Sequence, residues 1–264
     1  MHPFEYLRPA SVAEAIAAFR AAEDGKFLAG GMTLIPALKQ RLASPTHLID
    51  LSGIPGLATI RLDGGELVIG AMTPHGAVAA SPEVRSAIPA LADLASSIGD
   101  PQVRNRGTLG GSIANNDPAA DYPAAALALG ATIITDRRGI PADEFFPAMF
   151  ETALERDEIV LAVSFPVPSF AAYAKLRQPA SRYALVGVMI ARTPAGVRVA
   201  VIGAGANVFR QTDMELALNR DFSPSALEHI QTRDEGLISN IHASAAYRAH
   251  LVDVVAKRAL AAAF

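Results

Sequence analysis

The most informative part of the sequence runs from Gly99 to Pro123 and reads GDPQVRNRGTLGGSIANNDPAADYP. Glycines, asparagines, aspartates and two hydroxyl side chains, those of Thr108 and Ser112, follow one another with few apolar residues between them. We predict a long polar loop here. Such a loop must satisfy its own backbone hydrogen bonds or wrap around a polar ligand. Both a self-contained Ω-loop and a ligand-binding loop are compatible with the residues.

A second glycine-rich turn lies upstream, where Leu28-Ala29-Gly30-Gly31-Met32-Thr33 follows a short apolar run. The repeat of Leu34, Leu38 and Leu42 predicts a helix that begins at about Thr33. Paired glycines before a helix let a phosphate approach free backbone N–H groups. The alternative is a tight strand-to-helix turn that binds nothing.

Composition excludes several classes of protein. The 264 residues carry a formal charge of -3 and 51% hydrophobic residues, and they include no Cys. A balanced charge argues against nucleic-acid binding, and the lack of Cys excludes thiolate metal sites and Cys-ligated iron–sulfur clusters in this chain. No apolar run reaches the roughly 18 residues of a membrane span, and no secretory signal is visible, so we expect a cytoplasmic protein.

The remaining pattern predicts an α+β chain in three segments, 1–55, 56–168 and 169–264. Ser11 and Glu14 form a capping box before a helix, and Asp63-Gly64-Gly65 joins a hairpin. Thr73-Pro74 and Ser81-Pro82 each predict a helix start. Further helices are predicted at 91–98, 124–129, 223–230 and 243–260, and strands at 27–29, 47–51, 131–135, 158–165, 185–192 and 197–202.

No protein nucleophile stands out. The six histidines show no metal-binding spacing, and the sequence contains neither a G-x-S-x-G elbow nor a P-loop. Gly203-Ala204-Gly205 is interpreted as a strand end and turn, because no βαβ unit surrounds it. Two phosphate-friendly segments without a nucleophile indicate that a bound cofactor carries the chemistry.

These segments resemble the FAD-binding medium subunit of the molybdenum hydroxylases, the xanthine dehydrogenase and carbon monoxide dehydrogenase group. The resemblance rests on Phe4 to Pro9, on Ala29 to Pro36 and above all on Ile98 to Pro123. It implies a two-subdomain FAD-binding domain of the PCMH or vanillyl-alcohol-oxidase type, followed by a C-terminal domain of a three-stranded sheet with helices.

The resemblance also implies a set of FAD-binding residues. Residues of the 28–34 turn would hold the pyrophosphate, Lys175 would lie near the flavin, and Tyr173 would stack on or near its ring. Met32 departs from the small or polar residue usual in the family, and the chain is poorly matched beyond Arg210. The expected cofactor-binding residues are Leu28, Ala29, Gly30, Gly31, Met32, Thr33, Leu34, Ile98, Val103, Thr108, Gly111, Ser112, Ala114, Asn115, Ala120, Asp121, Val160, Tyr173 and Lys175.

For function, the resemblance implies an electron-transfer subunit. FAD would receive electrons from a 2Fe-2S small subunit, beside a molybdopterin large subunit, in a dimer of heterotrimers, and pass them to NAD, a quinone or oxygen. No catalytic side chain and no metal ligand are expected in this chain. A stand-alone FAD oxidoreductase and a flavin-free scaffold subunit remain as alternatives.

Overall fold

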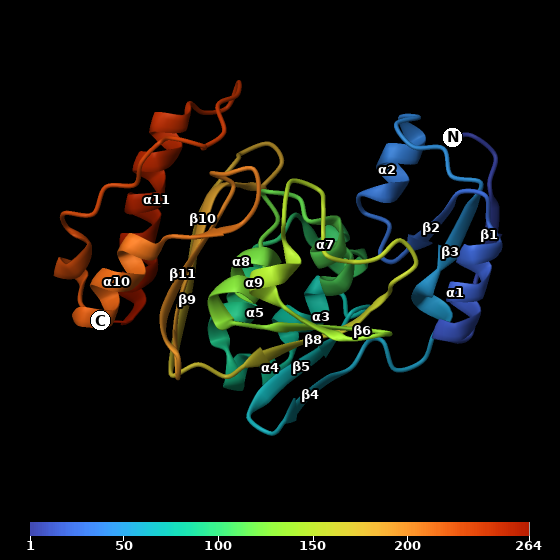
Figure 1. Cartoon of the computed structure of the whole chain (residues 1–264), viewed down its shortest axis with the longest axis horizontal. Coiled ribbons are helices and arrows are strands. Elements are labelled where there is room, and N and C mark those ends of the chain that lie inside the picture. The colour runs from blue at the N-terminus through green and yellow to red at the C-terminus, as the bar shows by residue number, and fades with distance from the viewer. Residues whose placement is uncertain (264) are drawn as a thin grey trace.

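The computed structural model describes residues 1–263, and its elements form three sheets arranged along the molecule. Figure 1 shows the N-terminal sheet at one end, the second sheet in the middle and the third sheet with α10 and α11 at the other end. The strands are β1 (Glu5–Leu7), β2 (Gly25–Leu28), β3 (His47–Asp50), β4 (Ile60–Asp63), β5 (Glu66–Gly70), β6 (Thr132–Thr135), β7 (Gly139–Pro141), β8 (Val160–Pro166), β9 (Phe170–Arg177), β10 (Ala184–Thr193), β11 (Gly196–Ile202) and β12 (Phe209–Arg210). The α-helices are α1 (Val12–Ala21), α2 (Leu34–Lys39), α3 (His75–Ala80), α4 (Pro82–Ala87), α5 (Pro89–Ser96), α6 (Pro101–Arg106), α7 (Leu109–Asn115), α8 (Tyr122–Leu129), α9 (Ala142–Phe145), α10 (Thr212–Arg220) and α11 (Ala245–Leu260), and short 3₁₀ helices span Leu51–Gly53, Pro224–Leu227 and Ala261–Ala263.

The N-terminal sheet is parallel and has the order β1-β3-β2. The capping box confirms the predicted start of α1, because Ser11 accepts from the Glu14 amide and Glu14 accepts from the Ala10 amide. Ala15 and Phe19 turn inward from α1 and pack with Ile49 of β3. This small core fixes the end of β2, from which the glycine-rich turn leaves.

The middle sheet is antiparallel, with the order β4-β5-β8-β6-β7. The predicted hairpin at Asp63-Gly64-Gly65 is confirmed, with positive φ at both glycines. Helices α3, α4, α5, α7 and α8 share a core with this sheet, α6 packs against α3, and α8 is buried along its whole length. An apolar helix with no polar face requires such a position between other layers.

The third sheet has three long antiparallel strands, β9, β10 and β11, extended by the two-residue β12. Its two faces carry different residues. Val186, Val188 and Ile190 of β10 face α11, whereas Met189 and Ala191 face the core that contains α8. Each of the three sheets falls within one of the predicted segments, and the division at residues 55 and 168 stays a proposal.

Several sequence predictions are wrong. The segment from Gly99 to Asp121 is not one loop, because α6 and α7 lie within it. Helix α2 ends at Lys39, and Leu42 lies outside it with 77% of its surface exposed. Thr73 does not cap α3, for which Pro74 is the N-cap residue. The helix predicted at 223–230 is only the 3₁₀ helix Pro224–Leu227.

Other elements gave no usable signal. They include β1, β7, β9, α9 and α10. β9 carries Ala171, Ala172 and Ala174, whose low β propensity hides a strand that tertiary pairing with β10 stabilises. β9 is therefore a strand because it pairs with β10, and its own residues do not predict it.

Candidate functional site

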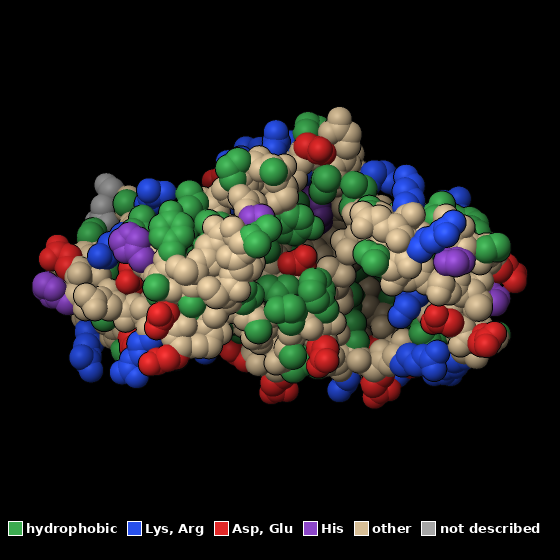
Figure 2. Space-filling model, turned by 90° about the horizontal axis from the view of Figure 1, so that it is seen from above, with side chains coloured by type: hydrophobic (Ala, Val, Ile, Leu, Met, Phe, Trp, Pro, Cys, Tyr) green, Lys and Arg blue, Asp and Glu red, His purple; other side chains and the backbone are tan. Residues whose placement is uncertain are grey.

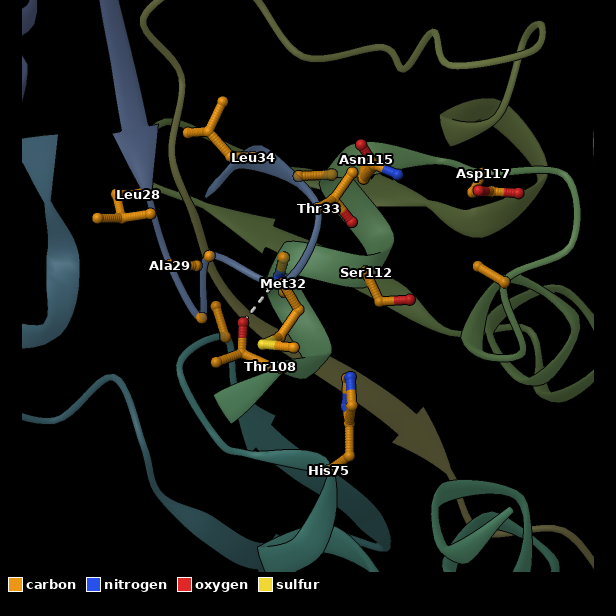
Figure 3. A pocket seen from close by; sticks show the side chains of 18 of the residues that line it. Leu28, Ala29, Met32, Thr33, Leu34, His75, Thr108, Ser112, Asn115 and Asp117 are labelled. Atoms are coloured by element: carbon orange, nitrogen blue, oxygen red, sulfur yellow. Dashed lines mark hydrogen bonds between the residues drawn. The ribbon is translucent and has the colours of Figure 1, made fainter. Parts of the chain in front are cut away.

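A cavity of about 680 Å³ lies between the N-terminal sheet and the middle of the molecule. Its wall includes the turn between β2 and α2, the residues from Ile98 to Asp121 that face it, Val160 of β8 and the turn between β9 and β10. Figure 3 shows that the β2–α2 turn and α7 lie close together in the wall of this cavity. The two segments that the sequence identified separately therefore form one site.

The β2–α2 turn comes very close to the junction of α6 and α7. A Cβ atom at Gly30 would lie 1.9 Å from the Arg106 carbonyl oxygen, so only glycine allows this approach. Gly31 has a φ of +74°, which also favours glycine. Within residues 1–263, the amides of Gly30, Gly31, Met32 and Thr33 donate no hydrogen bond to a protein group. These neighbouring free donors are suited to an anionic ligand such as a pyrophosphate.

Helix α7 supplies polar side chains to the cavity beside the turn. Thr108 is its N-cap residue, and the Thr108 Oγ1 accepts from the Gly111 amide at 3.1 Å. Gly110 lies so close to Ala71 that a Cβ atom would be 2.4 Å from the Ala71 Cβ. Ser112 and Asn115, three residues apart, line the cavity, and their side chains have no hydrogen-bond partner in the described part of the chain. They are available to ligand hydroxyl groups.

Seventeen of the nineteen predicted residues line this cavity, and the two exceptions are Tyr173 and Lys175. Both lie behind Asp121, whose Oδ1 accepts from the Tyr173 hydroxyl at 2.5 Å and from the Lys175 Nζ at 2.7 Å. Only 3% of the Lys175 side chain and 5% of the Asp121 side chain are exposed. Burial raises the pKa of Asp121, and the Lys175 ammonium opposes that rise. Asp121 therefore lies in the cavity wall, and the Lys175 ammonium behind it is paired with the Asp121 carboxylate.

The cavity also contains residues that the sequence analysis did not select, and His75 is the clearest of these (Figure 3). Its ring tilts against that of Tyr122 at a centroid distance of 5.3 Å, and its Nδ1 is buried without a partner. Burial, with the nearby Arg104 guanidinium, lowers the pKa of His75 to about 4, so the ring is neutral at pH 7. No sequence pattern marked this histidine, because only folding brings α3 to the cavity.

Asp117 and Tyr183 were also missed. Asp117 lies within the polar segment, and burial raises its pKa. Tyr183 comes from the β9–β10 turn, far along the chain from the rest of the site. Its position depends on how β9 and β10 pair.

Within residues 1–263 we find no cluster of three or more His, Asp or Glu side chains placed to hold a metal ion. No helix in this range has the length and apolar character to cross a membrane. On the face in Figure 2, acidic and basic side chains are interspersed rather than segregated.

The comparison with protein families identifies the class of protein. A family model described as the FAD binding domain in molybdopterin dehydrogenase matches residues 2–168, which include the β2–α2 turn and α7. The chain belongs to the FAD-binding medium subunits of the molybdenum hydroxylases, and it is an oxidoreductase subunit with FAD as its cofactor.

Individual relatives agree along nearly the full chain. The carbon monoxide dehydrogenase medium chain of Hydrogenophaga pseudoflava is 36% identical, over 99% of this chain and 97% of the relative. The nicotine 6-hydroxylase medium subunit of Paenarthrobacter nicotinovorans is 35% identical, over 97% and 95%.

Solved structures show the same similarity. A chain of carbon monoxide dehydrogenase from Hydrogenophaga pseudoflava superposes with a TM-score of 0.90 at 35% identity, covering 100% of this chain and 98% of the other. A chain of quinoline 2-oxidoreductase from Pseudomonas putida 86 gives 0.90 at 30% identity, with the same coverage. These comparisons confirm the predicted family, the α+β fold and the cofactor.

Proposed function

We propose that this chain is the flavin relay of a molybdenum hydroxylase, taking electrons from an iron–sulfur subunit and delivering them to a terminal acceptor. The observation that carries the proposal is the row of free amides from Gly30 to Thr33, which lines the same cavity as the polar side chains of α7. These free donors and the unpaired Ser112 and Asn115 side chains match a ligand with a pyrophosphate and sugar-like hydroxyls.

Each part of the cavity has a role in holding FAD. The amides of the β2–α2 turn bind the pyrophosphate, and Ser112 and Asn115 contact the ribityl chain. The side chains of Ile98 and Val103 pack against the cofactor and exclude water. Bound FAD supplies the ability to exchange electrons singly and in pairs.

Asp121 and Lys175 together determine the charge of this part of the wall. Because the carboxylate and the ammonium are paired, they contribute little net charge to the cavity. A cation alone at this position would favour an anionic reduced ring and raise its potential, and the pairing weakens that effect. Direct contact of Lys175 and Tyr173 with FAD stays a prediction.

The absence of Cys supports the assignment of partners. This chain cannot hold a Cys-ligated cluster, so the electrons come from another polypeptide. We propose a 2Fe-2S small subunit and a molybdopterin large subunit as partners, in a dimer of heterotrimers. A cytoplasmic location also stays a prediction.

Flavin content tests the cofactor site. The purified chain should show a flavin absorbance spectrum, either as isolated or after incubation with FAD. Gly111→Leu should abolish it, because a Cβ atom there would lie 2.8 Å from the Thr108 Oγ1 and the rest of the side chain would enter the cavity. The exposed Gly139 in β7 provides the control, and Gly139→Leu should retain flavin. Wild-type protein that never binds flavin would contradict the proposal.

Co-purification tests the partners. Chain isolated under mild conditions from its native cells should bring two further polypeptides, with iron and molybdenum in the complex. A flavin-loaded chain that purifies alone and is reduced directly by a small substrate would instead support a stand-alone oxidoreductase.

A further inference from the structure

A second cavity, of about 330 Å³, adjoins the first and shares Asp117, Ser181 and Tyr183 with it. The rest of its wall consists of Pro118, Ala119, Phe150, Gln178, the start of β10, Gly203 after β11, and the segment before α11 with Arg248 of that helix. The proposed flavin site does not use this space. Its volume is at the lower end for small-molecule pockets.

Arg248 of α11 is the main charged group of this cavity, and only 4% of the residue is exposed. Its Nη1 donates to the carbonyl oxygens of Leu185 and Gly203, each at 2.7 Å. Its Nη2 donates to the Asn240 Oδ1 at 3.0 Å. Its Nε is buried and has no hydrogen-bond partner. Three neutral acceptors thus surround the guanidinium, and two of its five N–H groups, that of Nε and the second of Nη2, have no partner in the described residues.

The charge of Arg248 is not compensated within the described residues. No carboxylate there lies within ion-pair distance of it. Burial alone lowers the pKa of Arg248, with no acidic neighbour raising it. Asp117, the carboxylate in the wall, has its own pKa raised by burial, which disfavours its charged form. Buried charges in proteins are generally paired, because leaving one unpaired costs several kcal/mol.

A purely structural role accounts for part of this arrangement. Arg248 ties the end of β11 to the start of β10 and to the segment before α11. That role explains the three hydrogen bonds. It does not explain why a full positive charge lies beside a cavity with no carboxylate paired to it in the described residues.

We propose that the second cavity binds a small oxyanion, a carboxylate or phosphate group, that compensates the charge of Arg248. A guanidinium recognises these groups preferentially, because its planar array of N–H donors matches their oxygens. Asn240, Gln178 and Ser181 in the same wall supply further polar groups, and His242 lies at the exposed edge. The site binds either a free oxyanion or the anionic end of a small molecule.

The substitution Asn240→Asp tests this proposal. The Asn240 Oδ1 accepts from Arg248 and from the amides of His242 and Ala243, and an aspartate oxygen can accept all three bonds. The variant therefore retains the local structure and places a permanent negative charge beside the guanidinium. Inorganic phosphate is titrated by calorimetry into FAD-loaded full-length chain, in which FAD occupies the β2–α2 amides. Phosphate affinity should fall about tenfold or more, with no loss of thermal stability.

Ile241→Asp is the matched control. Ile241 is 95% exposed and outside the cavity wall, so the variant adds the same charge one residue away without reaching Arg248. It should bind phosphate like wild type. Flavin absorbance of the same samples separates a failure to bind FAD from a failure to bind phosphate.

Three results would overturn the proposal: no phosphate binding by wild type, unchanged binding by Asn240→Asp, or equal losses in Asn240→Asp and Ile241→Asp. A titration with NADH in saturating phosphate then identifies the source of the oxyanion. Weakened NADH binding means that a dinucleotide carries it, and unchanged NADH behaviour means a free oxyanion. Both results agree with the proposed site.

Discussion

Asp121 illustrates how one residue links the core to the cavity wall. It is buried, it lines the larger cavity, and it accepts hydrogen bonds from Tyr173 and Lys175. The two partners lie 52 and 54 positions later in the chain. The buried carboxylate is therefore stable in the wall only because β9 places the Tyr173 hydroxyl and the Lys175 ammonium within hydrogen-bonding distance of it.

Removing the lysine should expose the cost of this arrangement. Lys175→Met leaves the Asp121 carboxylate buried without its counter-charge and should lower the free energy of unfolding by about 3–5 kcal/mol. The double variant Asp121→Asn with Lys175→Met removes both charges and should recover much of that loss. Urea unfolding of the flavin-free chain measures both, and a double variant no more stable than Lys175→Met would refute the pairing argument.

Thr108 has a different role, because its side chain supports the backbone of α7. Thr108→Ala removes the acceptor of the Gly111 amide and should cost about 1 kcal/mol, as expected for a lost N-cap. Thr108→Ser keeps the hydroxyl and should retain most of that stability. The comparison uses urea unfolding without flavin, and equal stability of all three proteins would show that the cap contributes nothing.

Helices α6 and α7 are two elements that the sequence pattern does not predict. Both helices are short, and glycine and asparagine within α7 have low helix propensity, so the segment resembles a loop. The start signals are nevertheless present, since Asp100 caps α6 before Pro101 and Thr108 caps α7. Packing of Gly110 on Ala71 then stabilises a helix that propensity alone does not favour.

The elements next to the cavity are also held by ion pairs. Glu158, just before β8, has a fully buried side chain that accepts from Arg138 at 2.9 and 3.0 Å, from the Thr135 hydroxyl and from the Glu155 amide. These donors, Arg138 foremost, lower its pKa from 4.5 to about 2. The β6–β7 turn is thereby fixed to the start of β8.

This pKa predicts a pH dependence. Because the folded state holds the proton less tightly than the unfolded state, the stabilisation is complete above pH 4.5 and is lost as pH falls towards 2. It amounts to about 2–3 kcal/mol. Wild type should thus be more stable than Glu158→Gln at pH 7, and the gap should narrow between pH 4.5 and 3 in urea titrations. A gap that does not change with pH would contradict this account.

The larger cavity lies between two parts of the molecule that have separate cores. The N-terminal core contains Phe19 and Ile49, whereas the middle core contains α8 and the inner faces of two sheets. A ligand in this cavity contacts both parts. Binding of FAD should therefore stabilise the complete fold rather than one segment.

Thermal unfolding with added FAD measures this linkage. At a free FAD concentration one hundred times Kd, the free energy of unfolding should rise by about 2.7 kcal/mol, which corresponds to roughly 5–10 °C in Tm for a chain of this size. Gly111→Leu should show no such shift, whereas Gly139→Leu should shift like wild type. A wild-type Tm independent of FAD would support the flavin-free scaffold instead.

The family, the cofactor and most of the cavity wall could be predicted from local sequence, because turns that bind a ligand with their backbone need glycines and short polar residues at adjacent positions. Local patterns also specified α1, the hairpin at Gly64 and most long helices. Folding alone brings Lys175 to Asp121 and His75 to Tyr122, and it places Arg248 beside a second cavity. Burial and pairing depend on contacts between segments far apart in the chain, and no local pattern records them.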